Sequence, residues 1–354
     1  MGHNFFEAQV ISKNSHTQDD DDWDRFLVTT PHGYHEQASV YLENRLSFGF
    51  HRAPVISRDA QGKILGGAQL LYQRTPIGRL ATLRCGPLAA DDNPELLARV
   101  VQDIDRAAQN YRLASIKVET LPTQSAAREA LANAGYQTGE SWEYDRRSAF
   151  VDLSLSDEGI LAGMDAKARS RIRGATRKGV TVTVGGPDDV ATFYRLHQQT
   201  SGYQQFPTFP LDFFETLTGG FGAEKAPVFV AMHEDQPVAA IICVLAGGRM
   251  YYCWGGMDRS PHVKELNANR LLHFEAMRWG KAQGATGYDL TGTNIFKDQF
   301  AHSKPAWPQA QRKLFGAFSP IRRRLIDTCG TSERLKQLTY RLSWRFGYTQ
   351  RMPF

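Results

Sequence analysis

The sequence contains few cysteines, no long apolar run and no leader of the secretory type, and each absence narrows the class of protein. Its four cysteines form no CxxC pair and have no histidine at ligand spacing, which argues against a zinc site or a disulfide framework and favours a reduced cytoplasm. No apolar run approaches the length of a membrane span, and the first residues lack the basic-then-apolar order of a signal peptide. With 354 residues, of which 42% are hydrophobic and 22% charged, the chain is expected to form a soluble protein with two cores.

The charged residues are distributed unevenly. The net charge is +5, yet the residues from Ala301 onward contain eleven Lys or Arg against Asp327 and Glu333, so the rest of the chain is mildly acidic. A second basic cluster runs from Lys167 to Lys178, where six of twelve residues are basic and none is acidic. Basic clusters on an acidic body favour an anionic partner such as a phosphate backbone, although a solvated helix face gives the same pattern.

Two halves of the chain follow one order of elements. In the first half the pattern predicts three strands, a helix and a further strand over "APVISRD", "ILGGAQLLYQR", "RLATLRCGP", "PELLARVVQDIDRAAQNY" and "ASIKVET". In the second half it predicts the same order over "APVFVAMHED", "VAAIICVLAG", "RMYYCWGG", "NRLLHFEAMRWGKAQG" and "TGYDLTGT". In each half the third strand ends in glycine before the helix begins. Agreement over this many consecutive elements indicates an internal duplication.

This order of elements is the layout of an acyltransferase of the GNAT type: a meander, a glycine-terminated strand, a helix and one more strand. In that layout the third strand, the helix N-terminus and the next strand form a cleft for a phosphate-bearing acyl donor. We therefore predict an α+β protein of the α/β sandwich type with two tandem GNAT acyltransferase-like domains. The predicted units are residues 1–150, residues 151–300 with the active site, and a basic, partly helical C-terminal extension over 301–354.

The sequence also resembles the Fem family, the aminoacyl-tRNA-dependent non-ribosomal peptidyltransferases with tandem GNAT-like domains. The resemblance covers roughly residues 23–300 and depends on the order of "GGAQLLYQRTPIG", "CGP", "RSRIRGATRKGV", "FYRLHQQT", "FPLDFFETL" and "YYCWGG". Its most specific motif is "DLTGT", where the family usually has Asp-Leu-Gly-Gly-Thr, with Phe296 and Lys297 just beyond it. The resemblance implies that an amine attacks the ester carbonyl of an aminoacyl-tRNA and forms an amide without ATP. The implied partners are aminoacyl-tRNA and a peptide or small-molecule amine, with no cofactor, and we expect a cytoplasmic monomer.

Phe296 and Lys297 are the predicted catalytic pair. In the family the lysine of this pair lies on the reacting centre, where it stabilises the oxyanion, and the aromatic ring shapes the pocket. A compact ammonium acts most strongly in a dry cleft. Taken alone, the two residues could equally be a surface lysine and a core phenylalanine. Asp289, on the preceding strand, is predicted either to orient the amine or take its proton, or to cap the turn that follows.

Five further residues are predicted to contact substrate. Tyr252 and Trp254 alternate along the glycine-terminated strand and should therefore share one face beside the cleft, although aromatic strand residues are more often part of a core. Tyr203 is predicted to lie in a loop that the family uses near its acceptor. Thr291 and Thr293 lie in the turn at which the cleft is predicted to open.

The basic residues form the predicted tRNA-binding surface. A helix that is basic on several faces and lacks acidic partners gains nothing from i,i+4 pairing, which favours a polyanion such as the tRNA acceptor arm. The predicted contacts are Lys167, Arg169, Arg171, Arg173, Arg177 and Lys178 in this helix, and Arg322, Arg323 and Arg324 in the C-terminal extension.

Two departures from the family pattern bear on the acceptor. After Lys297 the family commonly continues with Arg-Gly-Phe-Gly, whereas this chain has "DQFAHSKPAW" and retains only Phe300. The segment "TSGYQQFPTFPLDFF" lacks the arginine expected to hold the diphosphate of a nucleotide-linked cell-wall precursor, which leaves open a natural-product acceptor.

Two alternatives compete with aminoacyl transfer. An acyl-CoA-dependent GNAT N-acyltransferase would need a pyrophosphate-binding loop, and neither "CGPLAADDNP" nor "WGGMDRSPHVKELN" supplies one. A non-catalytic RNA-binding protein of the same fold would have no need of Phe296 and Lys297. No metal is expected in any of these cases.

Overall fold

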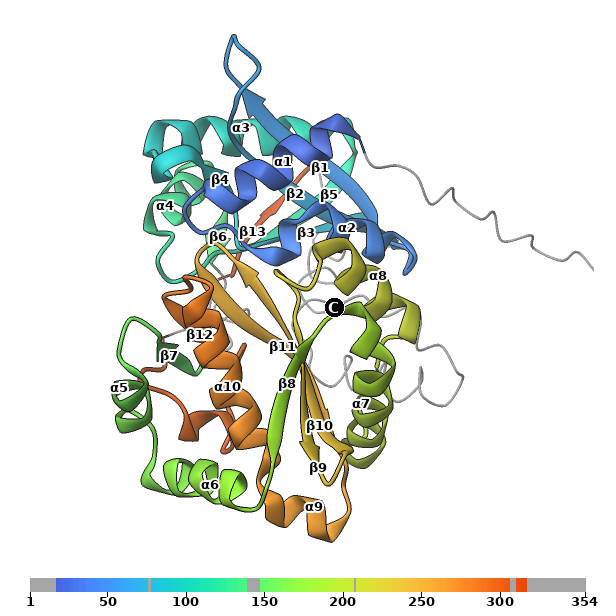
Figure 1. Cartoon of the computed structure of the whole chain (residues 1–354). Helices are drawn as coiled ribbons and strands as arrows, with labels where there is room; N and C mark the ends of the chain where they lie inside the picture. Colours follow the sequence, from blue (N-terminus) through green and yellow to red (C-terminus); the bar gives the residue numbers. More distant parts are fainter. Residues whose placement is uncertain (1–16, 76–77, 139–146, 207, 306–309, 317–354) are drawn as a thin grey trace, which may run out of the picture.

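The chain folds into two α+β units, each built on its own β-sheet, with the first-half unit above the second-half unit in Figure 1. A computed structural model describes residues 17–75, 78–138, 147–206, 208–305 and 310–316. The predicted α+β class and the repeated order of elements are confirmed, since a meander, a helical segment and a parallel strand occur in both units. Within the described ranges, no helix has both the length and the apolar character needed to cross a membrane.

The first-half unit contains the amino-terminal helices and a sheet that includes one strand from the end of the chain. Its strands are β1 (His51–Arg58), β2 (Ile64–Thr75), β3 (Gly78–Arg84), β4 (Leu88–Ala89), β5 (Leu113–Glu119), β6 (Gln137–Thr138) and β13 (Ala310–Leu314). Its helices are α1 (Gln18–Thr29), η1 (His35–Gln37), α2 (Ser39–Leu46), η2 (Ala90–Asp92), α3 (Pro94–Asn110) and α4 (Ser125–Asn133). The strand order is β1-β2-β3-β5-β13-β6, with β4 paired to β2.

Helix α3 shows how the sequence determines packing in this unit. Asn93 caps the helix by accepting hydrogen bonds from the backbone N–H groups of Glu95 and Leu96, and Pro94 occupies the first helical turn. Its apolar residues recur at helical spacing and pack on the sheet. The residues buried in this way are Leu97, Val100, Val101, Ile104 and Ala108.

The second-half unit has a sheet with helices on both faces. Its strands are β7 (Phe150–Asp152), β8 (Thr181–Gly185), β9 (Val228–His233), β10 (Gln236–Ala246), β11 (Arg249–Met257) and β12 (Gly287–Asp289), in the order β7-β12-β11-β10-β9-β8. Its helices are α5 (Asp157–Ala162), α6 (Ala166–Arg177), η4 (Pro187–Asp189), α7 (Val190–Gln204), α8 (Leu211–Phe221), α9 (Pro261–Leu266), α10 (Ala268–Ala282) and η5 (Lys297–Gln299). Helices α6 and α10 cover one face, and α7 and α8 cover the other (Figure 1).

A β-bulge in β11 changes the face on which the following residues lie. Ile242 pairs with Trp254 and Cys243 pairs with Tyr252, so Cys253 is an extra residue in β11. Tyr252 consequently packs against the core beneath α6 and α10, whereas Trp254 packs against the core beneath α7 and α8. The prediction that Tyr252 and Trp254 share one face is therefore wrong, because strict alternation does not hold across a residue that has no partner.

The parallel strand pair at the centre of each sheet differs in length between the two halves. In the first half, β3 pairs with β5 at six positions over Arg79–Arg84. In the second half, β11 pairs with β12 at three positions over Arg249–Tyr251, although β11 continues to Met257. The two strands of the second half therefore separate, and the rest of β11 has no β12 residue beside it.

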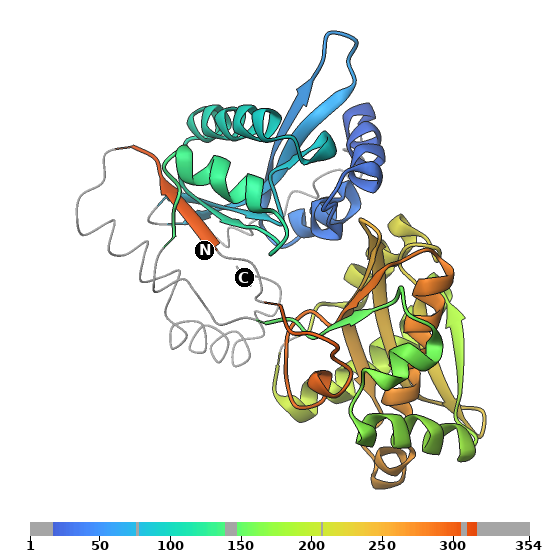
Figure 2. The same ribbon diagram turned by 90° about the vertical axis from the view of Figure 1, so that its left-hand side faces the viewer.

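The C-terminal extension supplies a strand to the first sheet. β13 pairs antiparallel with β5 and with β6 and lies between them. Figure 2 shows this strand within the first-half unit, although it follows the whole second half in the sequence. The extension predicted over 301–354 thus contains a structural strand, and its residues from 317 onward, including the predicted helix, lie outside the described residues.

The two units contact each other through α2, α8 and β11. Asn44 of α2 donates a hydrogen bond to the backbone carbonyl of Phe213 in α8 at 2.7 Å. Tyr34, just before η1, packs edge-on against Tyr251 of β11 with ring centroids 4.9 Å apart, and both side chains are buried. These contacts place first-half residues directly beside the strand that separates from β12.

Candidate active site

Two cavities meet at the part of β11 that has separated from β12. The second-half cavity, of about 560 Å³, lies between the end of β11, the start of α10 and Lys297. The inter-half cavity, of about 570 Å³, is lined by η1 and α2 of the first half and by the turn that follows β12. Cys253 and Trp254 line both cavities. Ligands in the two cavities would approach each other at these two residues.

Lys297 lies where β11 and β12 separate and lines the second-half cavity. The backbone N–H groups of Phe296 and Lys297 donate to Asn294 Oδ1 at 3.0 and 2.8 Å, which fixes the start of η5. Lys297 Nζ donates to the backbone carbonyls of Leu290 at 2.6 Å and Thr291 at 3.3 Å. Because an ammonium has three N–H donors, one is left for an oxygen atom of a ligand, as far as the described residues show.

Burial lowers the pKa of Lys297 from its usual value of 10.5 to about 8. Loss of water is the main cause, and the nearby Asp289 and Cys253 partly oppose it. At pH 7 the group is therefore still mainly cationic. A charge in a partly desolvated cleft interacts more strongly with a developing oxyanion than a charge in water does.

Asp289 is buried and caps the turn between β12 and η5. Its Oδ1 accepts hydrogen bonds from the backbone N–H of Thr291 at 2.7 Å and from the hydroxyl of Ser148. Ser148 Oγ in turn accepts from the backbone N–H of Gly292 at 3.0 Å, where a φ of 125° favours glycine. Burial raises the pKa of Asp289, and these hydrogen bonds oppose the rise. Of the two predicted roles for Asp289, the contacts favour the turn cap over direct contact with an amine.

Phe296 forms part of the wall of the second-half cavity. Its ring centroid lies 5.3 Å from that of Phe300 and 5.5 Å from that of His273, and the Arg270 guanidinium lies 5.2 Å from it. Burial, followed by the charges of Lys297 and Arg270, lowers the pKa of His273 to about 3, so this imidazole is neutral at pH 7. Phe296 is thus held against an uncharged aromatic cluster and presents its ring to the cavity.

The other predicted substrate contacts are divided between the two cavities. Tyr252 and Trp254 line the second-half cavity from opposite faces of the sheet, and Lys297 Nζ lies 5.3 Å from the Tyr252 ring centroid. Thr291 and Thr293 line the inter-half cavity. Thr291 Oγ1 also donates to the backbone carbonyl of Tyr252 at 2.6 Å, which links the turn to β11 across the opening.

Tyr203 lies in the last turn of α7 rather than in the predicted loop. Its side chain is 64% exposed, and its ring centroid lies 4.9 Å from the guanidinium of Arg259 and 5.1 Å from Nζ of Lys264. Arg259 and Lys264 line the second-half cavity, so Tyr203 borders the rim of that cavity.

The second-half cavity is cationic. Among the described residues, its lining includes no Asp or Glu, and its four basic members are Arg259, Lys264, Arg270 and Lys297. Burial and the neighbouring Arg171 of α6 lower the pKa of Arg270 to about 10, which shows that the charge of α6 extends to the cavity. Arg259, Lys264 and Arg270 were not predicted as site residues, although basic residues directly after the glycine-terminated strand were an available signal in the sequence.

The predicted RNA contacts of α6 lie on the outside of the second-half unit. Lys167, Arg173, Arg177 and Lys178 are exposed, and Arg169 and Arg171 are half-buried. No described Asp or Glu forms an ion pair with any of the six, although the Arg169 guanidinium donates to the backbone carbonyl of Met164. Arg322, Arg323 and Arg324 lie outside the described residues.

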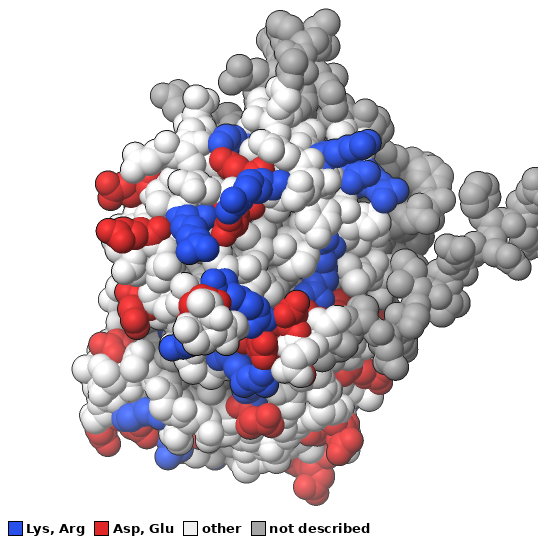
Figure 3. Space-filling view, turned by 90° about the horizontal axis from the view of Figure 1, so that it is seen from above, with Lys and Arg blue, Asp and Glu red and all other residues white. Residues whose placement is uncertain are grey.

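The first-half unit has a different charge arrangement. On the face seen in Figure 3, Lys and Arg side chains alternate with Asp and Glu. In the same unit, Arg58 lies 2.6 Å from Asp19 and 3.0 Å from Asp22. Arg58 is thus neutralised locally, unlike the basic residues of α6.

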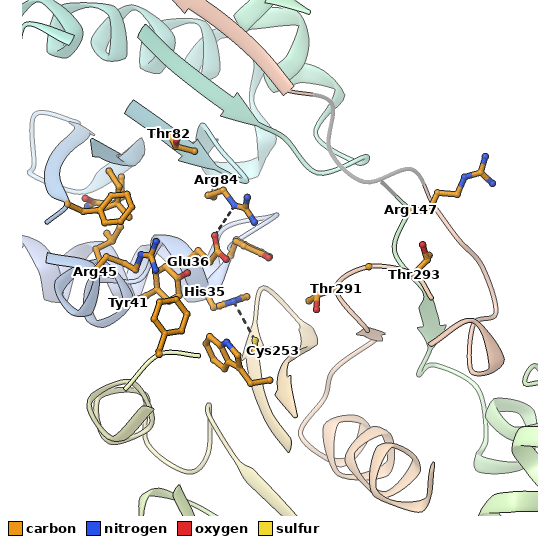
Figure 4. Close-up of a pocket in the computed structure, with 18 residues that line it drawn as sticks. His35, Glu36, Tyr41, Arg45, Thr82, Arg84, Arg147, Cys253, Thr291 and Thr293 are labelled. Carbon is orange, nitrogen blue, oxygen red and sulfur yellow. Dashed lines mark hydrogen bonds and ion pairs between the residues drawn. The ribbon is translucent and has the colours of Figure 1, made fainter. Parts of the chain in front are cut away.

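The inter-half cavity contains a neutral imidazole beside a thiol. His35 Nε2 lies 3.6 Å from Cys253 Sγ, as the dashed line in Figure 4 marks. Burial lowers the pKa of His35 to about 4 and raises the pKa of the Cys253 thiol. This pair could not be predicted from the sequence, because the two residues are 218 positions apart and only the packing of the units brings them together.

Arg84 of the first half is also part of this cavity wall. Its guanidinium lies 2.9 Å from a Glu36 carboxylate oxygen and 2.6 Å from a Glu119 carboxylate oxygen, so it is already neutralised. No group of three or more His, Cys, Asp or Glu that could hold a metal ion occurs in the described part of the chain. The described residues therefore provide cationic side chains, hydrogen-bond donors and cavity walls that can position a ligand.

Comparisons with known proteins agree with this geometry. Residues 166–299 match the family model of the acetyltransferase (GNAT) domain. A lipid II:glycine glycyltransferase of Staphylococcus aureus is 21% identical over 83% of this chain and 88% of its own length. The crystal structure of FemX superposes with a TM-score of 0.76 at 16% identity, over 88% of this chain and 99% of that one. The structure of L-PGS from Bacillus licheniformis superposes with a TM-score of 0.52 at 14% identity, over 82% and 93% of the two chains.

The fold and the opened strand pair define a transferase with two tandem GNAT-like acyltransferase domains. Over most of its length the chain is similar to proteins of the Fem type, in sequence to the glycyltransferase of S. aureus and in fold to FemX. The predicted resemblance and the predicted fold are both confirmed. The roles of individual site residues remain predictions.

Proposed function

We propose that the protein transfers an aminoacyl group from aminoacyl-tRNA to the amine of a peptide or small molecule and so forms an amide bond. The observation that carries this proposal is the position of Lys297, at the separation of β11 and β12, in a cationic cavity that meets a second cavity at Cys253 and Trp254. The relative from S. aureus, named for glycyl transfer to lipid II, favours a peptide-type acceptor. On this proposal the protein acts as a cytoplasmic monomer without a further cofactor.

The donor is assigned to the second-half cavity because of its charge. The 3′ end of an aminoacyl-tRNA brings phosphates close to the reactive ester, and the cavity has four basic side chains and no described carboxylate. Tyr203 at the rim offers an exposed ring on which a base can stack. The basic residues of α6 extend the same charge outward through Arg171 and Arg270, along the direction that an acceptor arm would take.

The acceptor is assigned to the inter-half cavity, with its amine near Cys253. The amine attacks the ester carbonyl carbon, the new C–N bond forms, and the bond from that carbon to the ribose oxygen breaks. The proton lost by the amine ends on the departing ribose oxygen. Lys297 supplies its remaining N–H to the carbonyl oxygen as this atom becomes an oxyanion. Asp289 acts indirectly, by holding the turn that positions Lys297.

An assay with total tRNA, synthetases, amino acids and ATP tests the donor. We expect the purified protein to transfer aminoacyl groups to amines, and we expect RNase to abolish transfer. Transfer from acetyl-CoA or another thioester in RNase-treated samples would refute the tRNA proposal.

The second candidate, acyl-CoA-dependent N-acyltransfer, gains support from the GNAT-domain match and from cavity cations that also suit a pyrophosphate. The same assay separates the two candidates. If the protein binds RNA but consumes neither donor, the remaining alternative, a non-catalytic RNA-binding protein, is correct.

A further inference from the structure

Arg45 is a buried cation whose charge has no partner in the described part of the chain. The residue is only 6% exposed, lies on α2 and lines the inter-half cavity. Its guanidinium forms no ion pair or hydrogen bond with any described residue. It is surrounded by rings instead, with the centroids of Phe50, Phe209 and Phe48 at 4.5, 5.4 and 6.0 Å. Rings compensate only part of the cost of removing a guanidinium from water.

The neighbouring arginines show that this arrangement is unusual for the protein. Arg84, in the same cavity, is held by Glu36 and Glu119, and Arg52, which is similarly buried, is held by Asp20 at 2.5 Å. In Figure 4, Arg45 and Tyr41 lie on the side of the cavity away from Thr291 and Thr293. The charge of Arg45, which no described residue compensates, is therefore at the end of the cavity opposite the turn that follows β12.

A second group in the cavity also lacks a described partner. Gln69 of β2 is 3% exposed and lines the same cavity. Its side-chain amide nitrogen and oxygen both have no hydrogen-bond partner among the described residues. A buried amide without partners costs stability, so its presence points to a ligand that supplies both an acceptor and a donor.

We propose that the inter-half cavity binds the acceptor through a single carboxylate held by Arg45, so that the acceptor is an amino acid or short peptide with a free carboxyl terminus. A guanidinium forms two parallel hydrogen bonds with a carboxylate. One unpaired cation matches the single charge of a carboxylate and leaves the charge of a diphosphate largely uncompensated. A volume of about 570 Å³ suits a molecule of this size. With the carboxylate at Arg45, the amine extends toward Cys253. This inference depends on the proposed aminoacyl transfer.

Acceptor selectivity tests the inference. The probes are amino acids and dipeptides with free carboxylates, the same compounds as carboxamides, and an amine linked to uridine diphosphate. We expect kcat/KM to be at least about 30-fold higher for the carboxylates than for the carboxamides. Arg45→Met should lower kcat/KM for the carboxylates by a similar factor, mainly through KM, and leave the carboxamides unchanged. Equal use of carboxylates and carboxamides, or a preference for the diphosphate-linked amine that Arg45→Met removes, overturns the proposal.

Thermal unfolding separates this role from a structural one. Arg45→Met removes an uncompensated buried charge and keeps most of the side-chain volume, so Tm should stay the same or rise. As the matched control, Arg84→Met should lower Tm, because it removes the ion pair that Arg84 forms with Glu36 and one of the ion pairs of Glu119. A fall in Tm for Arg45→Met, with equal losses for both kinds of acceptor, would mean that Arg45 only stabilises the fold.

Hydroxylamine, an amine without a carboxylate, distinguishes failure of this inference from failure of the proposed function. If wild-type protein does not transfer aminoacyl groups from tRNA to hydroxylamine or to any other probe, aminoacyl transfer itself is refuted. If transfer to hydroxylamine occurs and Arg45 has no effect on any acceptor, only the carboxylate site is refuted.

Discussion

The two halves of the molecule share one order of elements but differ at the centre of the sheet. In the first half, β3 and β5 stay paired to the end of both strands, where Arg84 lies opposite Glu119. In the second half, β11 and β12 part after three paired positions, and the space between them opens into a cavity. The closed pair supports the fold, whereas the opened pair exposes backbone and leaves room for a ligand. The difference shows how one scaffold provides both a structural unit and a reactive one.

The charges at the two strand ends differ in the same way. At the end of β5, Glu119 is neutralised by Arg84 and by Lys117, whose Nζ lies 2.7 Å away. At the end of β12, Asp289 accepts hydrogen bonds from a backbone N–H and from a hydroxyl, and it forms no ion pair with Lys297. The charge of Lys297 therefore remains available to the cavity that it lines. At this strand end the first half therefore keeps its ions in pairs, whereas the second half keeps Lys297 available.

The largest expected effect follows from removing that lysine. Lys297→Ala should lower aminoacyl transfer by about 10²- to 10³-fold, because it removes the donor nearest to the developing oxyanion. Its matched control in the first half is Lys117→Ala, which should change turnover less than about twofold because that side chain pairs with Glu119 and lines neither cavity. Single-turnover rates at saturating donor measure both. Near-normal activity of the Lys297→Ala variant would mean that Lys297 has no part in transfer, and it would contradict the proposed functional difference between the halves.

The next effect concerns RNA binding. Arg171→Glu combined with Arg173→Glu should weaken binding of deacylated tRNA about tenfold near 0.1 M salt and reduce the slope of log Kd against log salt by roughly two. Arg106→Glu on the first half is the control, because Arg106 already pairs with Asp103 and should not contact RNA. Filter binding over a salt series gives both quantities. If the affinity of the double variant for tRNA is unchanged, α6 is a solvated helix face and does not bind RNA.

A smaller effect is expected from the turn that positions Lys297. Ser148→Ala removes the hydroxyl between Asp289 and Gly292, and we expect about a tenfold loss of turnover and a loss of about 1–2 kcal/mol of unfolding free energy. In the first half, Thr120 follows β5, and its buried hydroxyl has no hydrogen-bond partner in the described part of the chain. Thr120→Val should therefore be neutral or slightly stabilising. Denaturant titration and turnover assays measure both variants. The proposed difference between the two halves is contradicted if Thr120→Val lowers the unfolding free energy and the turnover as much as Ser148→Ala does.

The smallest effect is a pH dependence. The pKa of Lys297 is lowered to about 8, so its charge is present below pH 8 and is lost as pH rises through that value. In Lys297→Arg the charge persists at every accessible pH. The ratio of wild-type to Lys297→Arg kcat/KM should thus fall by up to about tenfold between pH 7 and pH 9. Taking the ratio cancels the ionisation of the acceptor amine. A ratio that stays constant over this range contradicts the assigned role.

Much of this arrangement could be predicted from sequence, since strands and helices follow from local periodicity and Lys297 follows its strand by a fixed short spacing. The bulge at Cys253 could not be predicted, because a single unpaired residue leaves no signature in the alternation of apolar residues. The bulge nevertheless moves Trp254 to the other face of the sheet. Nor could Arg45 and His35 be placed, because they reach the site only through packing between the halves. Tyr203 was assigned to a loop by the resemblance to the family, whereas helix α7 continues to Gln204 and includes it.

The central claim is that the opened strand pair of the second half, and not the closed pair of the first, holds the reacting end of an aminoacyl-tRNA. Photo-crosslinking with an RNA minihelix that carries a stable aminoacyl amide and a photoreactive group at its 3′ end tests it directly. We predict crosslinks within residues 252–270 and 294–297 that excess aminoacyl-tRNA removes and that excess acetyl-CoA does not. Competed crosslinks confined to the first half, for example to residues 79–89 or 113–121, would contradict the claim.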